Sequence, residues 1–154
     1  MYLISACLAG QAVRYDAKSY IYPAIQELIA SDSAICACPE MLGGLPCPRS
    51  PAEIQGGTAQ DVLLGTAKII DSTGEDVTEA FLKGAQQTLM LAQKHRVKVA
   101  VLKEHSPSCG SSLIYDGTFS GKKVIGMGIT AALLRLHGID VISEQTFFSR
   151  LLTL

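Results

Sequence analysis

The 154-residue sequence has almost no net charge. It holds 13 Lys and Arg residues against 14 Asp and Glu residues, so its formal net charge at pH 7 is −1. A chain of this kind has no global positive field that would hold a polyanion such as tRNA or DNA. The charge balance therefore argues against a nucleic-acid partner.

A long apolar run and an export signal are also missing. The opening MYLISACLAGQAVRYD is apolar, but no basic residue precedes it and Arg14 interrupts it too early for a bilayer span. We interpret this segment as a buried strand, and we expect a cytoplasmic protein with no membrane partner. In that reducing compartment we expect the five cysteines to serve metal binding or catalysis, or to be small buried hydrophobic residues, and not to form disulfides.

Local cofactor motifs are absent as well. No GxGxxG follows the first apolar run and no P-loop pattern occurs, so dinucleotide or triphosphate binding has no support. The sequence also contains no CxxC pair and no CxxCxxC run, the local signatures of zinc ribbons and ferredoxins. Any metal site must therefore be assembled from cysteines that are far apart in the chain.

The composition, with 48% hydrophobic and 18% charged residues, is typical of a compact folded chain, and the length fits one domain. Four apolar runs predict strands, at residues 2–6, 33–37, 97–103 and 139–144. Helical periodicity predicts four helices, at residues 19–30, 76–96, 128–138 and 145–152. This alternation predicts a single three-layer α/β domain over residues 1–154, with a mostly parallel sheet between two layers of helices.

Smaller signals refine this prediction. Asp76 and Glu79 resemble a capping box at the start of the second helix, and Gly138 is expected to end the third. The segment 67–77 predicts a short strand or hairpin arm. Residues 38–57, CPEMLGGLPCPRSPAEIQGG, contain four prolines and four glycines and predict a long loop, and loops of this length in compact domains are usually functional.

Three cysteines follow predicted strands. Cys7 comes directly after the first and Cys38 directly after the second, whereas Cys109 lies in the Ser- and Gly-rich segment after the third. The carboxyl ends of parallel strands share one edge, where such folds bind ligands, so we expect the three thiols to converge. Three thiolates could hold zinc with one open position, or an iron-sulfur cluster with one iron that lacks a protein ligand. The spacing does not decide between them.

The other two cysteines are expected to differ from these. Cys36 alternates with Cys38 on the second strand and is expected to face the interior. Cys47 lies in the predicted loop, where it could be a fourth ligand, a residue of a substrate channel or an incidental thiol.

Polar residues suited to chemistry surround the three thiols. Glu40 lies two residues after Cys38, and Ser106 and Ser108 precede Cys109. A carboxylate near an electrophile can activate water, and a hydroxyl can relay a proton; the alternatives are a solvated carboxylate and serine-to-backbone turn bonds. His105 is the one histidine near this region. Five further residues could orient a small polar ligand or be solvated surface charges: Arg14, Asp16, Arg49, Glu53 and Lys103.

Three motifs, SACLAGQAVRYD, CPEMLGGLPCPRSPAEIQGG and KEHSPSCGSSLIYDGTFSG, occur in this order, and with them the sequence resembles the thiouracil desulfidase family over almost its whole length. The resemblance implies a Rossmann-like domain with a 4Fe-4S cluster that three cysteines hold and that keeps one open iron. Carried over by motif, the ligands are Cys7, Cys38 and Cys109, and the catalytic residues are Glu40 and Ser106. Two positions depart from the pattern: Ala17 stands where glycine is commoner, and Cys47 where threonine is.

The activity implied by the resemblance is removal of sulfur from thiouracil or a thiouridine-type nucleoside, giving uracil or uridine and hydrogen sulfide without net redox change. The expected partner is a small thiolated pyrimidine, because the sequence has no appended basic domain for tRNA. Three alternatives stay open: a structural zinc-binding module, a module that processes 4-thiouridine in tRNA, and an enzyme that uses Cys109 as a nucleophile with His105 as its base.

Overall fold

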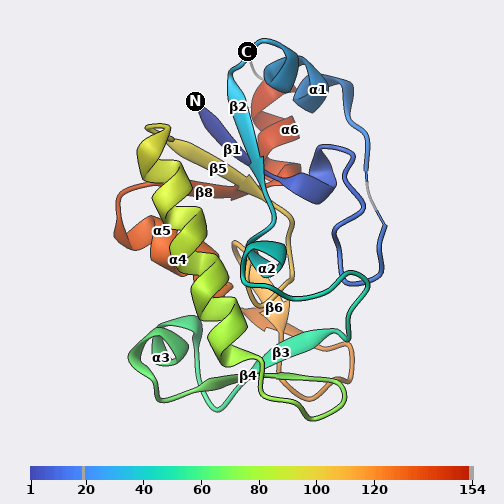
Figure 1. The fold of residues 1–154 in the computed structure, drawn as a ribbon, viewed down its shortest axis with the longest axis vertical. Helices are drawn as coiled ribbons and strands as arrows, with labels where there is room; N and C mark the ends of the chain where they lie inside the picture. Colours follow the sequence, from blue (N-terminus) through green and yellow to red (C-terminus); the bar gives the residue numbers. More distant parts are fainter. Residues whose placement is uncertain (19, 153–154) are drawn as a thin grey trace.

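The computed structural model describes residues 1–18 and 20–152; the expected span of 1–154 also includes Ser19, Thr153 and Leu154, which lie outside the described residues. The central sheet has four parallel strands in the order β2-β1-β5-β8 (Figure 1). They are β1 (Tyr2–Ser5), β2 (Ala34–Ala37), β5 (Val99–Leu102) and β8 (Asp140–Ser143). The predicted α/β fold with a mostly parallel sheet is confirmed.

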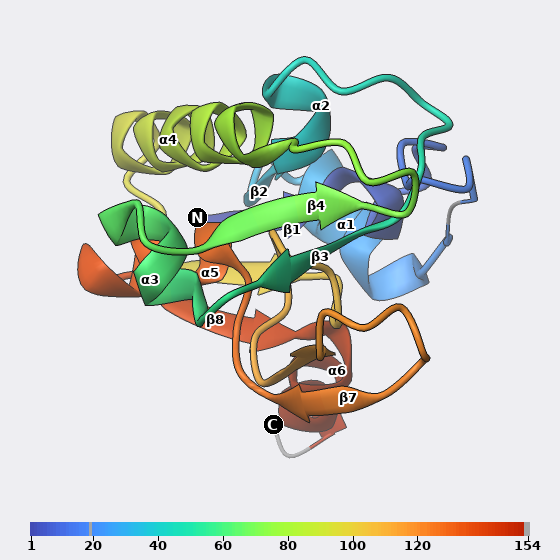
Figure 2. The same cartoon turned by 90° about the horizontal axis from the view of Figure 1, so that it is seen from below.

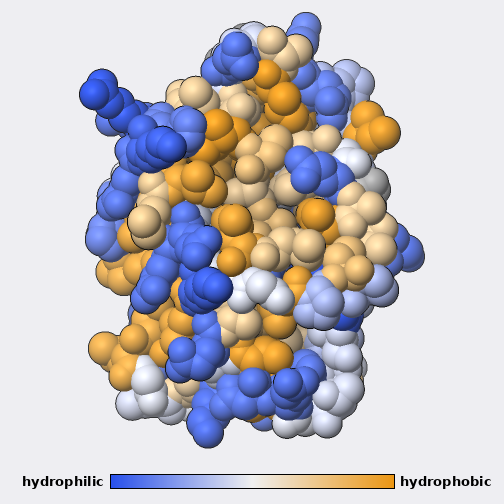
Figure 3. Space-filling view, viewed as in Figure 1, coloured by the Kyte–Doolittle hydropathy of each residue, from blue (hydrophilic) through white to orange (hydrophobic). Residues whose placement is uncertain are grey.

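Seven helical segments surround or follow the strands in the described part of the chain. They are η1 (Ala6–Leu8), α1 (Pro23–Ala30), α2 (Pro39–Leu42), α3 (Ala59–Leu64), α4 (Thr78–Lys94), α5 (Ile129–Leu136) and α6 (Glu144–Leu152). None of these described helices is both long and apolar enough to cross a bilayer. Hydrophilic side chains follow the outer face of α4 (Figure 3), where Lys83, Gln86 and Gln93 are exposed.

Alternate residues of the central strands face different helices. Leu3 and Ala100 share a buried cluster with Leu134 of α5 and with residues of α4. Ile4, the next residue of β1, packs instead in a cluster with residues of α1 and with Phe147 of α6. Successive side chains of a strand point to opposite faces, so helices cover both sides of the sheet. Each fully buried Leu or Ile contributes about 1.5–3 kcal/mol by leaving water.

Two antiparallel strand pairs extend the domain beyond the central sheet (Figure 2). The first pairs β3 (Ala52–Gln55) with β4 (Lys68–Asp71), and the second pairs β6 (Leu113–Tyr115) with β7 (Lys123–Ile125). A third buried cluster joins residues of β3, β4 and β6 to α3 and to the first turns of α4 and α5. Both pairs are thereby fixed beside the carboxyl ends of the central strands.

The backbones of α2 and α4 are in direct contact. A Cβ atom built on Gly84 of α4 would lie 1.8 Å from the carbonyl oxygen of Pro39, and one built on Gly43 would lie 1.9 Å from that of Ala80. Only glycine leaves room for this approach. The contact sets the position of the short helix that follows β2.

Several predicted boundaries were wrong. The segment 38–57 is not one loop, because α2 and β3 lie within it. The first predicted helix begins at Pro23 and not at the start of 19–30, since the proline fixes the first helical turn. Asp76 makes no capping box with Glu79; its carboxylate accepts the backbone N–H of Thr78 at 2.9 Å instead. Gly138 follows α5 with a φ of 78°, and its expected role at the helix end is confirmed.

Sequence interpretation missed α3, although its signal was present. Thr58 and Asp61 form a capping box, since the Thr58 hydroxyl accepts the Asp61 N–H and the Asp61 carboxylate accepts the Thr58 N–H. Gly65 ends the helix in the left-handed region with a φ of 87°. The predicted short strand in 67–77 is confirmed as β4.

Candidate active site

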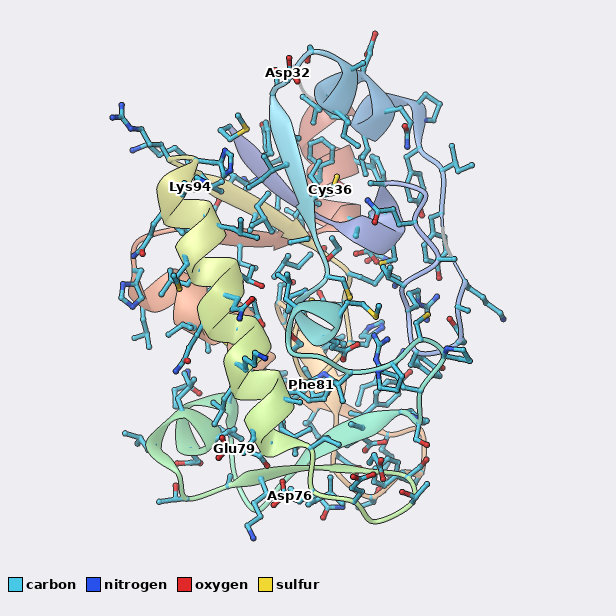
Figure 4. The ribbon with its side chains drawn as sticks, in the orientation of Figure 1. Asp32, Cys36, Asp76, Glu79, Phe81 and Lys94 are labelled. Carbon is cyan, nitrogen blue, oxygen red and sulfur yellow. The ribbon has the colours of Figure 1, made fainter. Side chains whose placement is uncertain are left out.

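A cavity of about 750 Å³ opens at the carboxyl ends of the central strands. Its walls come from the segments that follow β1, β2 and β5, together with residues of the β3–β4 and β6–β7 pairs. This volume lies in the range of about 300–1,000 Å³ that is usual for small-molecule sites. Phe81, labelled in Figure 4 near the start of α4, forms part of its apolar wall.

The three cysteines that follow predicted strands all line this cavity. Cys7 lies on η1 directly after β1, Cys38 directly precedes α2, and Cys109 lies in the loop after β5. All three are free thiols, and Cys7 and Cys109 are buried. The convergence expected from the strand order is therefore present in the structure.

Burial raises the pKa of each of these thiols and so disfavours the thiolate form. It raises the pKa of Cys7 to about 12, with the nearby Cys38 as the next cause. Burial also raises the pKa of Cys109 well above its usual value, and the charges of Glu40, Cys38 and Cys7 raise it further. Burial raises the pKa of Cys38 too, although the backbone N–H groups of Met41 and Glu40 oppose the effect.

This donor set suits an iron-sulfur centre. Three thiolates close enough to repel one another are stabilised when a cationic centre lies between them, and soft sulfur ligands are those that iron-sulfur clusters use. Cys7, Cys38 and Cys109 are the residues that could hold such a group. Within residues 1–18 and 20–152, no three His, Cys, Asp or Glu side chains are arranged to hold a single metal ion.

The remaining cysteines lie outside the lining of the cavity. Cys36 lies on β2, two residues before Cys38 (Figure 4), and it is half-buried, not fully buried as expected for an interior residue. The Cys47 thiol donates to the backbone carbonyls of Ala12 and Arg14 at 3.1 and 3.2 Å. It therefore links the loop between α2 and β3 to the loop between η1 and α1.

Glu40 lies in the first turn of α2 and forms an ion pair with Arg49 through its Oε2 atom. The Arg49 guanidinium also donates to the carbonyls of Val13 and Pro46, both at 3.0 Å. Burial lowers the pKa of Arg49, but the Glu40 carboxylate more than offsets this and the pKa is raised. Arg49 thus orients the carboxylate and is not a solvated surface charge.

Ser106 stands at the start of a tight turn that ends at Cys109. Its hydroxyl oxygen accepts the backbone N–H groups of Ser108 and Cys109 at 3.1 and 2.7 Å. Ser108 is 1% exposed, and its hydroxyl lies 2.7 Å from the hydroxyl of Thr130 on α5. A hydrogen bond from the Ser108 side chain to Cys109 opposes the rise in the pKa of that thiol. Ser106 lines the cavity and Ser108 does not.

Glu104 organises the same loop, and sequence interpretation missed it. Its carboxylate accepts the N–H and hydroxyl of Ser111 at 2.6 and 2.7 Å, and the N–H of Ser112 at 3.1 Å. Burial alone would raise the pKa of Glu104, but these hydrogen bonds outweigh it and the pKa is lowered. The sequence signal was the pair of serines that follows Cys109, whose groups need an acceptor in a compact loop.

The other polar candidates also lie at or near the cavity. Lys103 forms an ion pair of 3.1 Å with Glu144, and Arg14 forms one of 3.7 Å with Asp16. Of the polar candidates named from the sequence besides Glu40 and Ser106, five line the cavity and Asp16 and Ser108 do not; the five are Arg14, Arg49, Glu53, Lys103 and His105. Burial, followed by the charge of Lys123, lowers the pKa of His105.

Comparison with known proteins agrees with these motifs. Residues 2–146 match the family model described as 2-thiouracil desulfurase. A protein of Bacillus subtilis (strain 168) named "Uncharacterized protein YbbK" is 53% identical over 145 residues, covering 94% of this chain and 96% of that one. The solved structure of the 4Fe-4S-dependent thiouracil desulfidase TudS is 43% identical, with a TM-score of 0.86 over 99% of this chain and 95% of the other. By the extent of these matches, the chain belongs to the 2-thiouracil desulfurase family.

Proposed function

We propose that this protein is an iron-sulfur-dependent desulfidase that removes sulfur from thiouracil or a thiouridine-type nucleoside. The observation that carries the proposal is the meeting of three free thiols, Cys7, Cys38 and Cys109, with Glu40 and Ser106 in one cavity. Family membership and the similarity to TudS support it.

The three cysteines would hold a 4Fe-4S cluster and leave one of its irons without a protein ligand. When bound, the cluster supplies a Lewis-acidic iron with affinity for the soft sulfur of a thiocarbonyl group. Apolar side chains, Phe81 among them, form part of the cavity wall, and electrostatic interactions beside such a wall are stronger than in bulk water.

Glu40 is the proposed general base. Arg49 holds its Oε2 atom, and its Oε1 atom has no hydrogen-bond partner in the described part of the chain. Oε1 can therefore accept a proton from a water molecule that attacks the carbon of the carbon-sulfur bond. The fixed side chain orients this water without losing further freedom on substrate binding.

Ser106 is the proposed hydrogen-bond donor to the substrate ring. Its oxygen already accepts two backbone N–H groups, so its O–H hydrogen remains available to a group in the cavity. A ring nitrogen next to the thiocarbonyl carbon gains electron density during water attack, and a hydroxyl donor there stabilises that charge.

The overall reaction balances without any transfer of electrons to or from the substrate. One water is consumed, its oxygen becomes the carbonyl oxygen of the product pyrimidine, and the sulfur leaves with two protons as hydrogen sulfide. Turnover is therefore expected to need no reductant, and a stoichiometric requirement for one would contradict the scheme.

The test begins with anaerobic purification and measurement of iron and sulfide per chain, where we expect about four irons. Addition of 4-thiouracil should remove the thiobase absorbance and release hydrosulfide. Glu40→Gln and Ser106→Ala should keep the iron and lower kcat by about 10²- to 10⁴-fold, the usual contribution of acid-base groups.

Ser112→Ala is the matched control for Ser106→Ala, because Ser112 is an exposed serine of the same loop that does not line the cavity. It should retain kcat.

Full activity of Glu40→Gln would overturn the base assignment, and loss of iron in Ser106→Ala would assign that serine to positioning Cys109. One zinc per chain with no iron or sulfide would support the structural zinc module, and salt-dependent tRNA binding would support a tRNA substrate.

A further inference from the structure

Glu53 on β3 is a buried carboxylate that the proposed reaction does not use. It is 7% exposed and lines the cavity. No Lys, Arg or His among the described residues forms an ion pair with it. Burying a carboxylate without a counter-ion is costly unless hydrogen bonds compensate.

One oxygen of Glu53 is occupied by backbone donors. Oε1 accepts the N–H of Gly117 at 2.8 Å and the N–H of Phe119 at 3.3 Å, both from the turn between β6 and β7. That turn lies tightly against β3, since a Cβ atom on Gly117 would be 2.6 Å from the carbonyl oxygen of Ile54. The carboxylate is therefore held in one orientation.

The second oxygen has no donor. No hydrogen bond to Oε2 is formed by the described residues, yet none of their fully buried side-chain oxygens lacks a partner. Oε2 consequently keeps accessible surface, and the cavity is the space that Glu53 borders. Aromatic side chains of Tyr115 and Phe119 line the same cavity and provide an apolar surface for a flat ring or a sugar face.

Glu53 lies on a different sheet from the strands that precede the three thiols. It belongs to the β3–β4 pair, whereas the three thiols follow strands of the central sheet. A substrate whose thiocarbonyl group lies at the thiols would present other groups toward β3. A fixed hydrogen-bond acceptor there strengthens the binding of a substrate that carries a hydrogen-bond donor and weakens the binding of an analogue that lacks one.

We propose that Glu53 is a specificity-determining residue whose Oε2 accepts a hydrogen bond from the pyrimidine substrate, away from the carbon-sulfur bond. The inference rests on the proposed desulfidase function. The donor is either a ring N–H or a ribose hydroxyl, since both present the same chemistry to a carboxylate oxygen.

The test uses Glu53→Gln in the anaerobically prepared holoenzyme. Glutamine can keep an oxygen for Gly117 and Phe119 while it replaces the free acceptor by an NH₂ donor. Binding of the stable products uracil and uridine, measured by calorimetry, should weaken by about 10- to 100-fold, the loss expected for a hydrogen bond to a charged group. KM for the thiolated substrates should rise with it, and kcat should change little.

The two products distinguish the source of the donor. Equal weakening of uracil and uridine assigns a ring N–H, whereas weakening of uridine alone assigns a ribose hydroxyl. Unchanged binding of both would overturn the proposal. A wild-type enzyme that neither binds these products nor consumes a thiopyrimidine would refute the proposed function itself, so the two failures are distinguishable.

Gln55→Ala is the matched control. The Gln55 amide donates to the carbonyl of Gly117 at 2.8 Å, so it holds the same turn against β3 but does not line the cavity. It should leave product affinity within about twofold. If it weakens binding as much as Glu53→Gln does, at equal melting temperature, Glu53 acts by holding the turn and the proposed direct contact is wrong.

Discussion

Replacing Gly84 with alanine places a methyl group where α4 touches α2. The new Cβ atom would lie 1.8 Å from the carbonyl oxygen of Pro39 and 2.8 Å from its carbon, whereas ordinary contact begins at 3.4 Å. Both obstructing atoms belong to backbone, so no rotamer change relieves the clash and the two helices must separate. Overpacking of this kind costs about 1–3 kcal/mol, and the better helix propensity of alanine returns about 1 kcal/mol of the cost.

The obstruction is backbone, so we expect the upper part of that range and a net loss of about 2 kcal/mol in the free energy of unfolding. For a chain of this size that loss lowers the melting temperature by about 4–8 °C. α2 carries Glu40 and directly follows Cys38, so iron content and turnover should fall in the same variant.

Differential scanning calorimetry and iron analysis under anaerobic conditions measure both effects. Gln86→Ala, at an exposed position of the same helix, is the control and should stay within about 0.5 kcal/mol of wild type. A melting temperature of Gly84→Ala equal to or above that of the parent would refute direct backbone contact between the helices.

Two further predictions concern loop residues. Cys47→Ser should retain iron and cluster absorbance, because serine can keep the bonds to the Ala12 and Arg14 carbonyls; loss of iron would make Cys47 a ligand. The pKa of Glu104 is lowered from 4.5 in the folded chain, so its contribution to stability is present above pH 4.5 and is lost as the pH falls toward the lowered value. Glu104→Gln should therefore reduce stability at neutral pH and flatten its decline in acid, as followed by thermal unfolding between pH 3 and 7; an unchanged decline would show that other groups set the acid sensitivity.

The central sheet could be predicted because its signals are local. The apolar runs around Leu3, Ile35 and Val101 are short and bounded by turn residues, and strand order with helices between them leaves few topologies. The convergence of the three thiols followed from the same rule, since each lies at or beyond a strand end. The capping box of Thr58 and Asp61 was equally local and could have revealed α3.

The loop chemistry could not be predicted in the same way. Whether Arg49 meets Glu40 or solvent depends on the path of the chain between α2 and β3, which no periodicity encodes. β6 and β7 are three residues each, and all of Lys123–Ile125 is exposed, so no buried alternation marks that strand. Glu53 contacts residues of a different segment, and Glu104 accepts hydrogen bonds from several residues of one loop. Both sets of contacts depend on the three-dimensional path of the chain, so the sequence pattern does not reveal them.

The dispersal of Cys7, Cys38 and Cys109 over three strand ends has a consequence for how the protein acquires a cofactor. A zinc ribbon offers its ligands within a few residues and can capture metal as a peptide, but here an unfolded chain presents only isolated thiols. The complete ligand set exists after β1, β2 and β5 have paired, and Cys109 follows the last of these in the order of synthesis. Any group that needs all three thiols therefore binds the native state selectively and raises its stability in proportion to its occupancy.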